Sequence, residues 1–179
     1  MVIELRKLQM KKVIALTLSF IVLHAFAAER PTVKVETGAL QGAVEYNMNV
    51  FKNIPYAAPP VGDLRWRPPQ PAASWSGTRD ASQFGDTCPQ PNLKNENKGL
   101  GLPGNEDCLK LNVFTPQKPG KDLPVMVWIH GGALQMDGAR DPIYKPINLV
   151  KNGVIVVTFD YRLGSLGFFA SKELVEEAK

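Results

Sequence analysis

The sequence contains few residues of the kinds that bind metals or act as catalytic bases. Its 179 residues include two histidines, His24 and His130, and two cysteines, Cys88 and Cys108. No second Cys or His lies at ligand spacing from either cysteine, which argues against a zinc site. A catalytic cysteine needs a histidine partner, and neither histidine is plausibly placed for that role. The chain also has no internal repeat and no low-complexity segment.

The N-terminal region lacks an apolar run long enough to cross a bilayer. The run at residues 13–23 is short, whereas a membrane helix needs about 20 apolar residues. It follows Arg6, Lys7, Lys11 and Lys12 and precedes the small-x-small tripeptide at residues 25–27. This order is typical of a signal peptide. We expect residues 1–27 to be removed, which leaves a secreted or periplasmic chain, residues 28–179, with no stable membrane anchor. A buried core helix is the alternative, and Met10 is an alternative start.

Beyond this leader the sequence shows no basic stripe. Removal of residues 1–27 takes away four basic residues and one acidic residue, so the formal charge falls from +4 to +1. Proteins that bind nucleic acid present clustered positive charge on one face. The charge pattern therefore gives no support for a nucleic-acid partner.

The two cysteines suit a disulfide. An exported chain with two cysteines favours a bridge between them, here Cys88–Cys108. Such a bridge closes a loop of about 20 residues and stabilises the fold by about 3 kcal/mol if it acts through the entropy of the unfolded chain.

Short alternating segments predict strands in the first part of the chain. Residues 32–36, 39–45 and 50–54 are separated by turn signals and predict a small antiparallel meander. The prolines within residues 55–71 exclude a helix or a central strand there. We expect Trp66 and Trp75 to pack this segment against the domain.

Longer apolar segments follow. Residues 108–114 alternate as a strand, whereas residues 123–129 and 154–159 are almost wholly apolar. Continuous runs of this length are typical of strands buried on both faces of an α/β sheet. A short helical turn is expected within residues 142–152, and Ser171 is a plausible N-cap for a helix that begins there.

Four segments, in this order, resemble the type-B carboxylesterases, the family of the para-nitrobenzyl esterases and cholinesterases. They are residues 53–66 (NIPYAAPPVGDLRW), 106–116 (EDCLKLNVFTP), 125–133 (VMVWIHGGA) and 154–170, which begins VIVVTFDYRLG and ends GFFA. Lys110 departs from the family pattern, which usually has an aromatic residue there. The resemblance covers about residue 31 to the end. It implies the N-terminal portion of an α/β-hydrolase fold, small-molecule ester substrates, and no metal or organic cofactor.

The resemblance also implies an oxyanion hole at residues 131–133. Ester hydrolysis places negative charge on the carbonyl oxygen, and preset backbone N–H groups stabilise that charge. In the family the donors are the N–H groups of Gly132 and Ala133, while Gly131 completes the turn. His130 is expected to position this turn, because in hydrolases of this order the catalytic histidine follows the nucleophile.

The nucleophile expected from the family is missing from the sequence. The serine of these enzymes lies in a G-x-S-x-G elbow, and no such pentapeptide occurs here. Ser165, between Gly164 and Gly167, lacks the spacing. The interpretation is therefore a serine carboxylesterase segment that supplies the oxyanion loop without the triad and is inactive alone. We also expect residues 154–159, a central strand in the family, to be left as an open apolar edge. The alternatives are a non-catalytic hydrolase-fold binding or adhesion protein and a truncated gene product.

Overall fold

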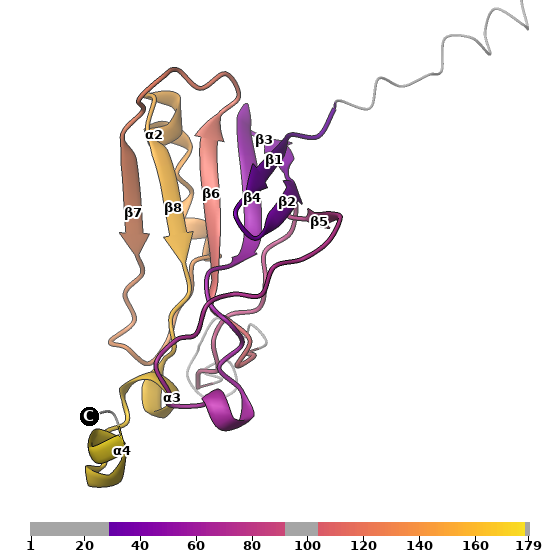
Figure 1. The fold of residues 1–179 in the computed structure, drawn as a ribbon. Helices are drawn as coiled ribbons and strands as arrows, with labels where there is room; N and C mark the ends of the chain where they lie inside the picture. The colour runs from indigo at the N-terminus through magenta and orange to yellow at the C-terminus, as the bar shows by residue number, and fades with distance from the viewer. Residues whose placement is uncertain (1–28, 92–103, 178–179) are drawn as a thin grey trace, which may run out of the picture.

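The computed structural model describes residues 29–91 and 104–177. The expected signal peptide lies outside these residues, as does the middle of the loop between the two cysteines. Most of the described strands form one five-stranded mixed sheet, in the order β3-β4-β6-β8-β7 (Figure 1). Their bounds are β3 Ala43–Glu45, β4 Met48–Pro55, β6 Lys110–Pro116, β8 Ile155–Phe159 and β7 Val125–Ile129. This mixed sheet agrees with the expected N-terminal portion of an α/β-hydrolase fold.

A second, smaller sheet changes the expected meander. It contains β1 (Thr32–Val35), β2 (Gly38–Gln41) and β5 (Thr78–Asp80) in the order β1-β2-β5. β1 and β2 form the expected hairpin, but β2 pairs in parallel with β5, and residues 39–45 divide between the two sheets. Gly42 lies at the division, where a Cβ would be 2.3 Å from the carbonyl oxygen of Val50. The close backbone approach at this glycine lets the chain pass from one sheet to the other.

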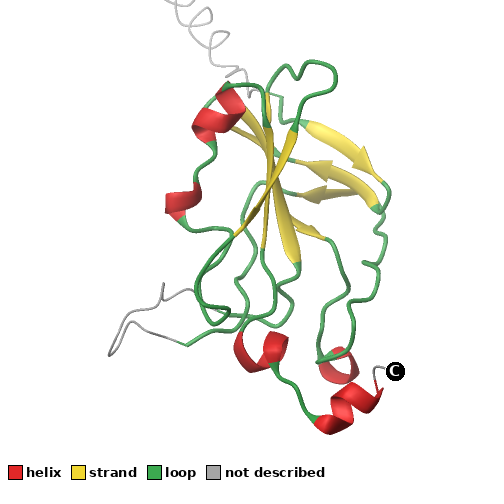
Figure 2. Ribbon diagram, turned by 90° about the vertical axis from the view of Figure 1, so that its left-hand side faces the viewer, coloured by secondary structure: helices red, strands yellow, loops and turns green. Residues whose placement is uncertain are grey.

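The five-stranded sheet is covered on both faces over β4 and β6, and β8 contributes to the core on one of these faces. On one face Val50, Phe114 and Val156 pack with Val150 of helix α2 (Ile147–Lys151). On the opposite face Phe51 packs with Leu40 of β2 and Ala81, beside β5. Figure 2 shows the helical segment and the small sheet on opposite sides of the larger sheet. Adjacent residues of β4 thus contribute to two separate cores, as the alternation of a strand requires.

Strand β7 is at the edge of the sheet, and its exposure contradicts the prediction that it is buried on both faces. Its five side chains are 42–65% exposed. β7 pairs in parallel with β8 on one side, and no strand among the described residues pairs with its other side. The open apolar edge that was expected at residues 154–159 is therefore at β7, while β8 lies between β6 and β7 with Val156 and Thr158 buried.

The proline-rich segment and the C-terminal part lie near the carboxyl ends of β7 and β8. The segment contains one short turn, η1 (Gly62–Leu64), and otherwise no helix or strand after Pro55, as expected. Trp75 is half-buried and its ring N–H donates to the Ala39 carbonyl, whereas Trp66 is 45% exposed and donates to the Ser165 carbonyl. The predicted packing holds fully for Trp75 and in part for Trp66.

Short helices fill the remaining connections. They are η2 (Pro142–Tyr144), α2, α3 (Gly164–Phe168) and α4 (Lys172–Glu177). The expected helical turn within residues 142–152 is confirmed by η2 and α2. Ser171 accepts a hydrogen bond from the N–H of Leu174 at 3.2 Å, which confirms it as the N-cap of α4.

Candidate functional site

The candidate site begins where β7 ends. β7 and β8 run in the same direction, so the residues after each strand meet at one edge of the sheet (Figure 1). His130 and the glycines follow β7, and Asp160 and Tyr161 follow β8. In open α/β sheets this carboxyl edge is where ligands bind.

The backbone of the loop after β7 is unusual. Gly132, Ala133 and Leu134 have φ values of 103°, 53° and 61°, a region that residues with a side chain rarely adopt. The Gly132 carbonyl accepts hydrogen bonds from the N–H groups of Gln135 and Met136, at 3.0 and 3.1 Å. A Cβ on Gly132 would lie 1.9 Å from the Met136 carbonyl oxygen. Only glycine fits at position 132 of this turn.

The two N–H groups named as oxyanion donors are free in the described part of the chain. Neither Gly132 nor Ala133 donates its backbone N–H to an acceptor within residues 29–91 and 104–177. Ala133 is exposed, so a substrate oxygen can reach it. The geometry is compatible with the oxyanion role, which stays a prediction.

His130 is buried, and it contacts the loop and its neighbours as a structural residue does. Its ring stacks on Tyr161 with 4.3 Å between centroids and 16° between planes. Nδ1 lies 2.9 Å from the Gly131 carbonyl oxygen, and the Tyr161 hydroxyl donates to the His130 carbonyl at 2.8 Å. Nε2 has no hydrogen-bond partner among the described residues and lies 3.9 Å from Asp160 Oδ1. With its side chain 1% exposed, His130 is poorly placed to accept a proton from a substrate.

Asp160 is a residue of the site that the sequence analysis did not single out. It is 6% exposed, and burial raises the pKa of its carboxyl from 3.8 to about 6. Two groups counteract this rise in pKa: the Ala139 N–H, which donates to Oδ1 at 2.9 Å, and the charge of Arg140. The charge of Asp137 adds to the rise. The Asp160 carbonyl accepts a hydrogen bond from the Tyr56 hydroxyl at 2.7 Å. Burial likewise raises the pKa of Tyr56, to about 12, so this hydroxyl remains a donor.

A signal for Asp160 and Tyr161 was present in the sequence. Both follow a strand that was expected to lie in the same sheet as residues 123–129. Residues that follow neighbouring parallel strands meet at one edge, so these two could have been placed beside His130. Gln90 and Tyr144, which also contact this region, gave no comparable signal, because their contacts depend on how loops fold.

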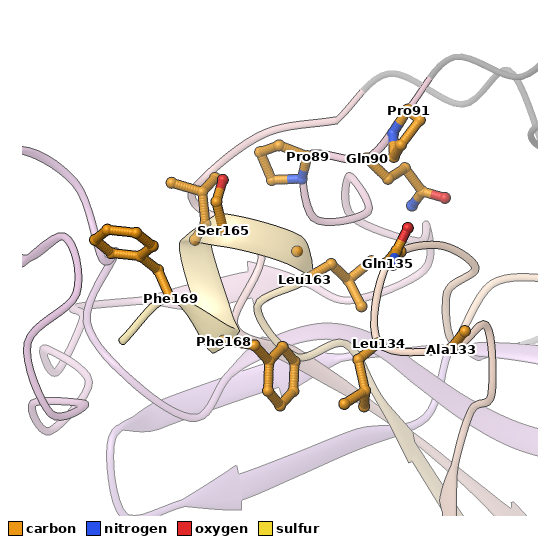
Figure 3. A pocket seen from close by; sticks show the side chains of 12 residues that line it. Pro89, Gln90, Pro91, Ala133, Leu134, Gln135, Leu163, Ser165, Phe168 and Phe169 are labelled. Carbon is orange, nitrogen blue, oxygen red and sulfur yellow. The ribbon is translucent and has the colours of Figure 1, made fainter. Parts of the chain in front are cut away.

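A cavity adjoins the loop. It has a volume of about 770 Å³ and is lined by Ala133 and Leu134, by Pro89 and Gln90, and by residues of α3 and Phe169 (Figure 3). Ser165 of α3 also lines it, but the Ser165 hydroxyl has no hydrogen bond to a histidine or carboxylate in the part of the chain that the structure describes. A serine without a base is a weak nucleophile.

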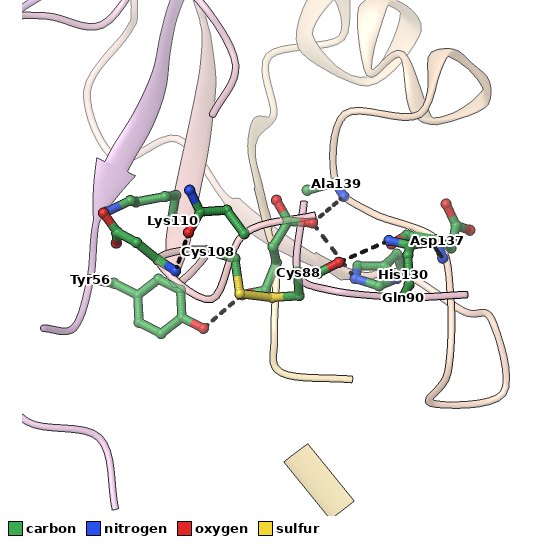
Figure 4. Close-up of a disulfide and its surroundings, with 11 residues drawn as sticks. Tyr56, Cys88, Gln90, Cys108, Lys110, His130, Asp137 and Ala139 are labelled. Carbon is green, nitrogen blue, oxygen red and sulfur yellow. Dashed lines mark hydrogen bonds and ion pairs between the residues drawn. A yellow bond between two sulfur atoms is a disulfide. The ribbon is translucent and has the colours of Figure 1, made fainter. Parts of the chain in front are cut away.

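The predicted disulfide is present. Cys88 and Cys108 are bonded, with 5.0 Å between their Cα atoms, and both are buried among Ala57, Leu109 and Leu163 (Figure 4). No group of three or more His, Cys, Asp or Glu side chains suited to a metal ion occurs in residues 29–91 or 104–177. Over the same residues, every helix is too short or too polar to span a membrane.

Known proteins with similar sequences include esterases. The chain is 45% identical over 145 residues to the fumonisin B1 esterase of Sphingopyxis macrogoltabida. The aligned region covers 80% of this chain and 26% of that protein. It is 45% identical over 138 residues to the para-nitrobenzyl esterase of Bacillus subtilis strain 168, covering 76% of this chain and 28% of that protein. The chain thus spans less than a third of the length of these relatives.

Solved structures and a family sequence model agree with these relatives. A PNB esterase structure superposes with a TM-score of 0.76 at 41% identity, over 83% of this chain and 31% of that chain. A carboxylesterase from Geobacillus stearothermophilus gives 0.69 at 38% identity, over 78% of this chain and 28% of that chain. The sequence model of the carboxylesterase family matches residues 29–178. The chain therefore belongs to the carboxylesterase family.

Proposed function

We propose that this chain supplies the oxyanion-hole half of a type-B serine carboxylesterase that hydrolyses small-molecule esters through an acyl-serine intermediate. The observation that carries the proposal is the loop after β7, where the N–H groups of Gly132 and Ala133 are unpaired within the described residues. Ala133 also lines the cavity of about 770 Å³. Donors that are fixed before the reaction stabilise the developing oxyanion without reorganisation. No metal or organic cofactor takes part in this mechanism.

The proposal includes the inactivity of residues 1–179 alone. The sequence has no G-x-S-x-G elbow. Ser165 has no base among the described residues, and His130 is stacked and buried. A strand that pairs with the free edge of β7 would continue the sheet beside the oxyanion loop. In the α/β-hydrolase arrangement the nucleophile follows a strand of this sheet, so we propose that the rest of the site joins at β7.

Export to the periplasm or the medium is also part of the proposal. The basic and apolar order of residues 1–27 supports it, and so does the disulfide between Cys88 and Cys108, since such bonds persist in oxidising compartments.

A chimeric enzyme tests the proposed function. Residues 29–177 replace the matching segment of the Bacillus subtilis para-nitrobenzyl esterase, which supplies the remainder of the enzyme. We expect the chimera to hydrolyse para-nitrophenyl acetate, and the 179-residue chain alone to give no turnover above buffer, because only the chimera combines both halves of the site.

The recipient enzyme is the positive control, and thermal unfolding verifies that the chimera folds. A folded chimera without turnover would contradict the proposal and would favour a non-catalytic binding protein. Turnover by the isolated chain would contradict its predicted inactivity.

A further inference from the structure

We propose that Gln90 is a positioning residue that holds the oxyanion loop in its working conformation. The inference rests on the proposed function, because it gives Gln90 a role in the same site. Gln90 lies outside the oxyanion loop that follows β7; it is two residues after Cys88.

The side-chain amide of Gln90 binds both backbone groups of one loop residue. Its Oε1 accepts a hydrogen bond from the Asp137 N–H at 2.8 Å, and its Nε2 donates to the Asp137 carbonyl at 2.9 Å (Figure 4). The same Nε2 also donates to the Cys88 carbonyl at 3.2 Å. One amide therefore connects the loop to the backbone at the disulfide.

Asp137 is a position where the loop needs such support. Its φ of 84° lies in a region that a residue with a side chain adopts only when its surroundings impose it. Two contacts to its side chain also contribute, since Gly138 donates its N–H to Oδ1 at 2.7 Å and Tyr144 donates its hydroxyl to Oδ2. The hydrogen bond to Asp137 raises the pKa of Tyr144 to about 12, so that hydroxyl remains a donor.

The positions of the proposed oxyanion donors depend directly on the position of Asp137. Asp137 follows Met136, whose N–H binds the Gly132 carbonyl at 3.1 Å. The backbones at positions 132 and 136 are so close that a Cβ on Gly132 would lie 1.9 Å from the Met136 oxygen. A shift of Asp137 therefore moves Gly132 and, through it, Ala133.

The other end of the connection is fixed in the core. Cys88 is 1% exposed and is bonded to Cys108, which precedes β6 in the interior of the sheet. Strand β7, which carries the loop, is exposed along its length. Gln90 thus attaches the loop to a buried anchor that the edge strand alone does not provide.

The test replaces Gln90 by methionine, which keeps the length of the side chain and removes its hydrogen bonds. In the 179-residue chain we expect the Asp137 amide to exchange with deuterium about tenfold faster or more, because it loses its acceptor. Amides of β8 should be unchanged. The matched control is Gln83→Met, since Gln83 is exposed and its side chain makes no hydrogen bond among the described residues.

In the chimera, Gln90→Met should lower kcat about 10- to 100-fold with little change in KM, because misplaced donors weaken binding of the transition state more than binding of the substrate. Gln90→Glu keeps the acceptor for the Asp137 N–H and loses both donated bonds. Gln90→Glu should therefore give an intermediate loss of kcat and retain protection of the Asp137 amide from exchange. This variant replaces Gln90→Met in the test if the methionine variant does not fold.

Unchanged exchange at Asp137 in Gln90→Met, or faster exchange with an unchanged kcat, would overturn the inference. So would a Gln90→Glu variant whose kcat equals that of the unsubstituted chimera. If the unsubstituted chimera folds but has no turnover, the proposed function has failed. The exchange measurement still decides in that case whether Gln90 holds the loop.

Discussion

Replacing Ala133 by lactic acid in the chimera should lower kcat for para-nitrophenyl acetate by about 100- to 1000-fold, the loss typical of removing one oxyanion donor. The substitution exchanges the backbone N–H for an ester oxygen and keeps the methyl group. It removes one of the two N–H groups that are unpaired in the described residues. KM should change little, because this donor binds the charge that develops in the transition state.

The ester replacement is preferable to a side-chain mutation at this position. Ala133 has a φ of 53°, whereas proline, the residue that lacks an N–H, requires a φ near −65° and would distort the turn. The matched control is lactic acid at Ala73, which is exposed and donates its N–H to no acceptor in the described residues. Equal rates for the two ester variants would show that Ala133 is not an oxyanion donor.

The second large effect concerns Asp160. Burial raises the pKa of its carboxyl to about 6 in the folded chain, above the ordinary value of 3.8. A raised pKa means that the folded state favours the protonated form. The stabilisation is therefore complete below pH 4 and is lost as the pH rises through 6. The shift corresponds to about 3 kcal/mol.

Asp160→Asn measures this contribution, since asparagine has a similar size and does not ionise. Between pH 4 and pH 7 the free energy of unfolding of the unsubstituted chain should fall by about 3 kcal/mol relative to the variant. Urea denaturation at a series of pH values gives both curves. Asp122→Asn, on the exposed turn before β7, is the control and should follow the unsubstituted chain. Parallel curves for the chain and for Asp160→Asn would mean that Asp160 ionises without penalty.

The parts of the fold that follow from local pattern could be predicted. The proline-rich segment, the helix cap at Ser171 and the disulfide each depend on a few residues whose chemistry is visible in the sequence. The Gly-Gly-Ala turn was assigned through the family resemblance; the glycine pair alone indicates only a backbone that can adopt unusual φ values.

The exposure of β7 could not be predicted from its apolar residues. The run at residues 125–129 has the composition of a strand covered on both faces, but composition does not show which strands are neighbours. In the structure β8 takes the interior position and β7 the edge. The free edge of β7 is then open to pairing with a further strand.

Contacts between loops were also beyond prediction. Gln90 binds a residue 47 positions later in the chain, and Tyr56 reaches the carbonyl of Asp160, 104 positions later. Such pairs depend on the path of irregular segments, for which a single sequence gives no periodic signal. The place of Asp160 beside His130, by contrast, follows from strand order once β7 and β8 are known to be neighbouring parallel strands.

The most direct test of the central claim is a crystal structure of the chimera inhibited by a trifluoromethyl ketone, which forms a tetrahedral adduct with a catalytic serine. We expect the adduct oxygen to lie about 2.7–3.1 Å from the backbone nitrogens of Gly132 and Ala133, as an oxyanion hole requires. An adduct oxygen that points away from both nitrogens, or that is bound by other groups, would contradict it.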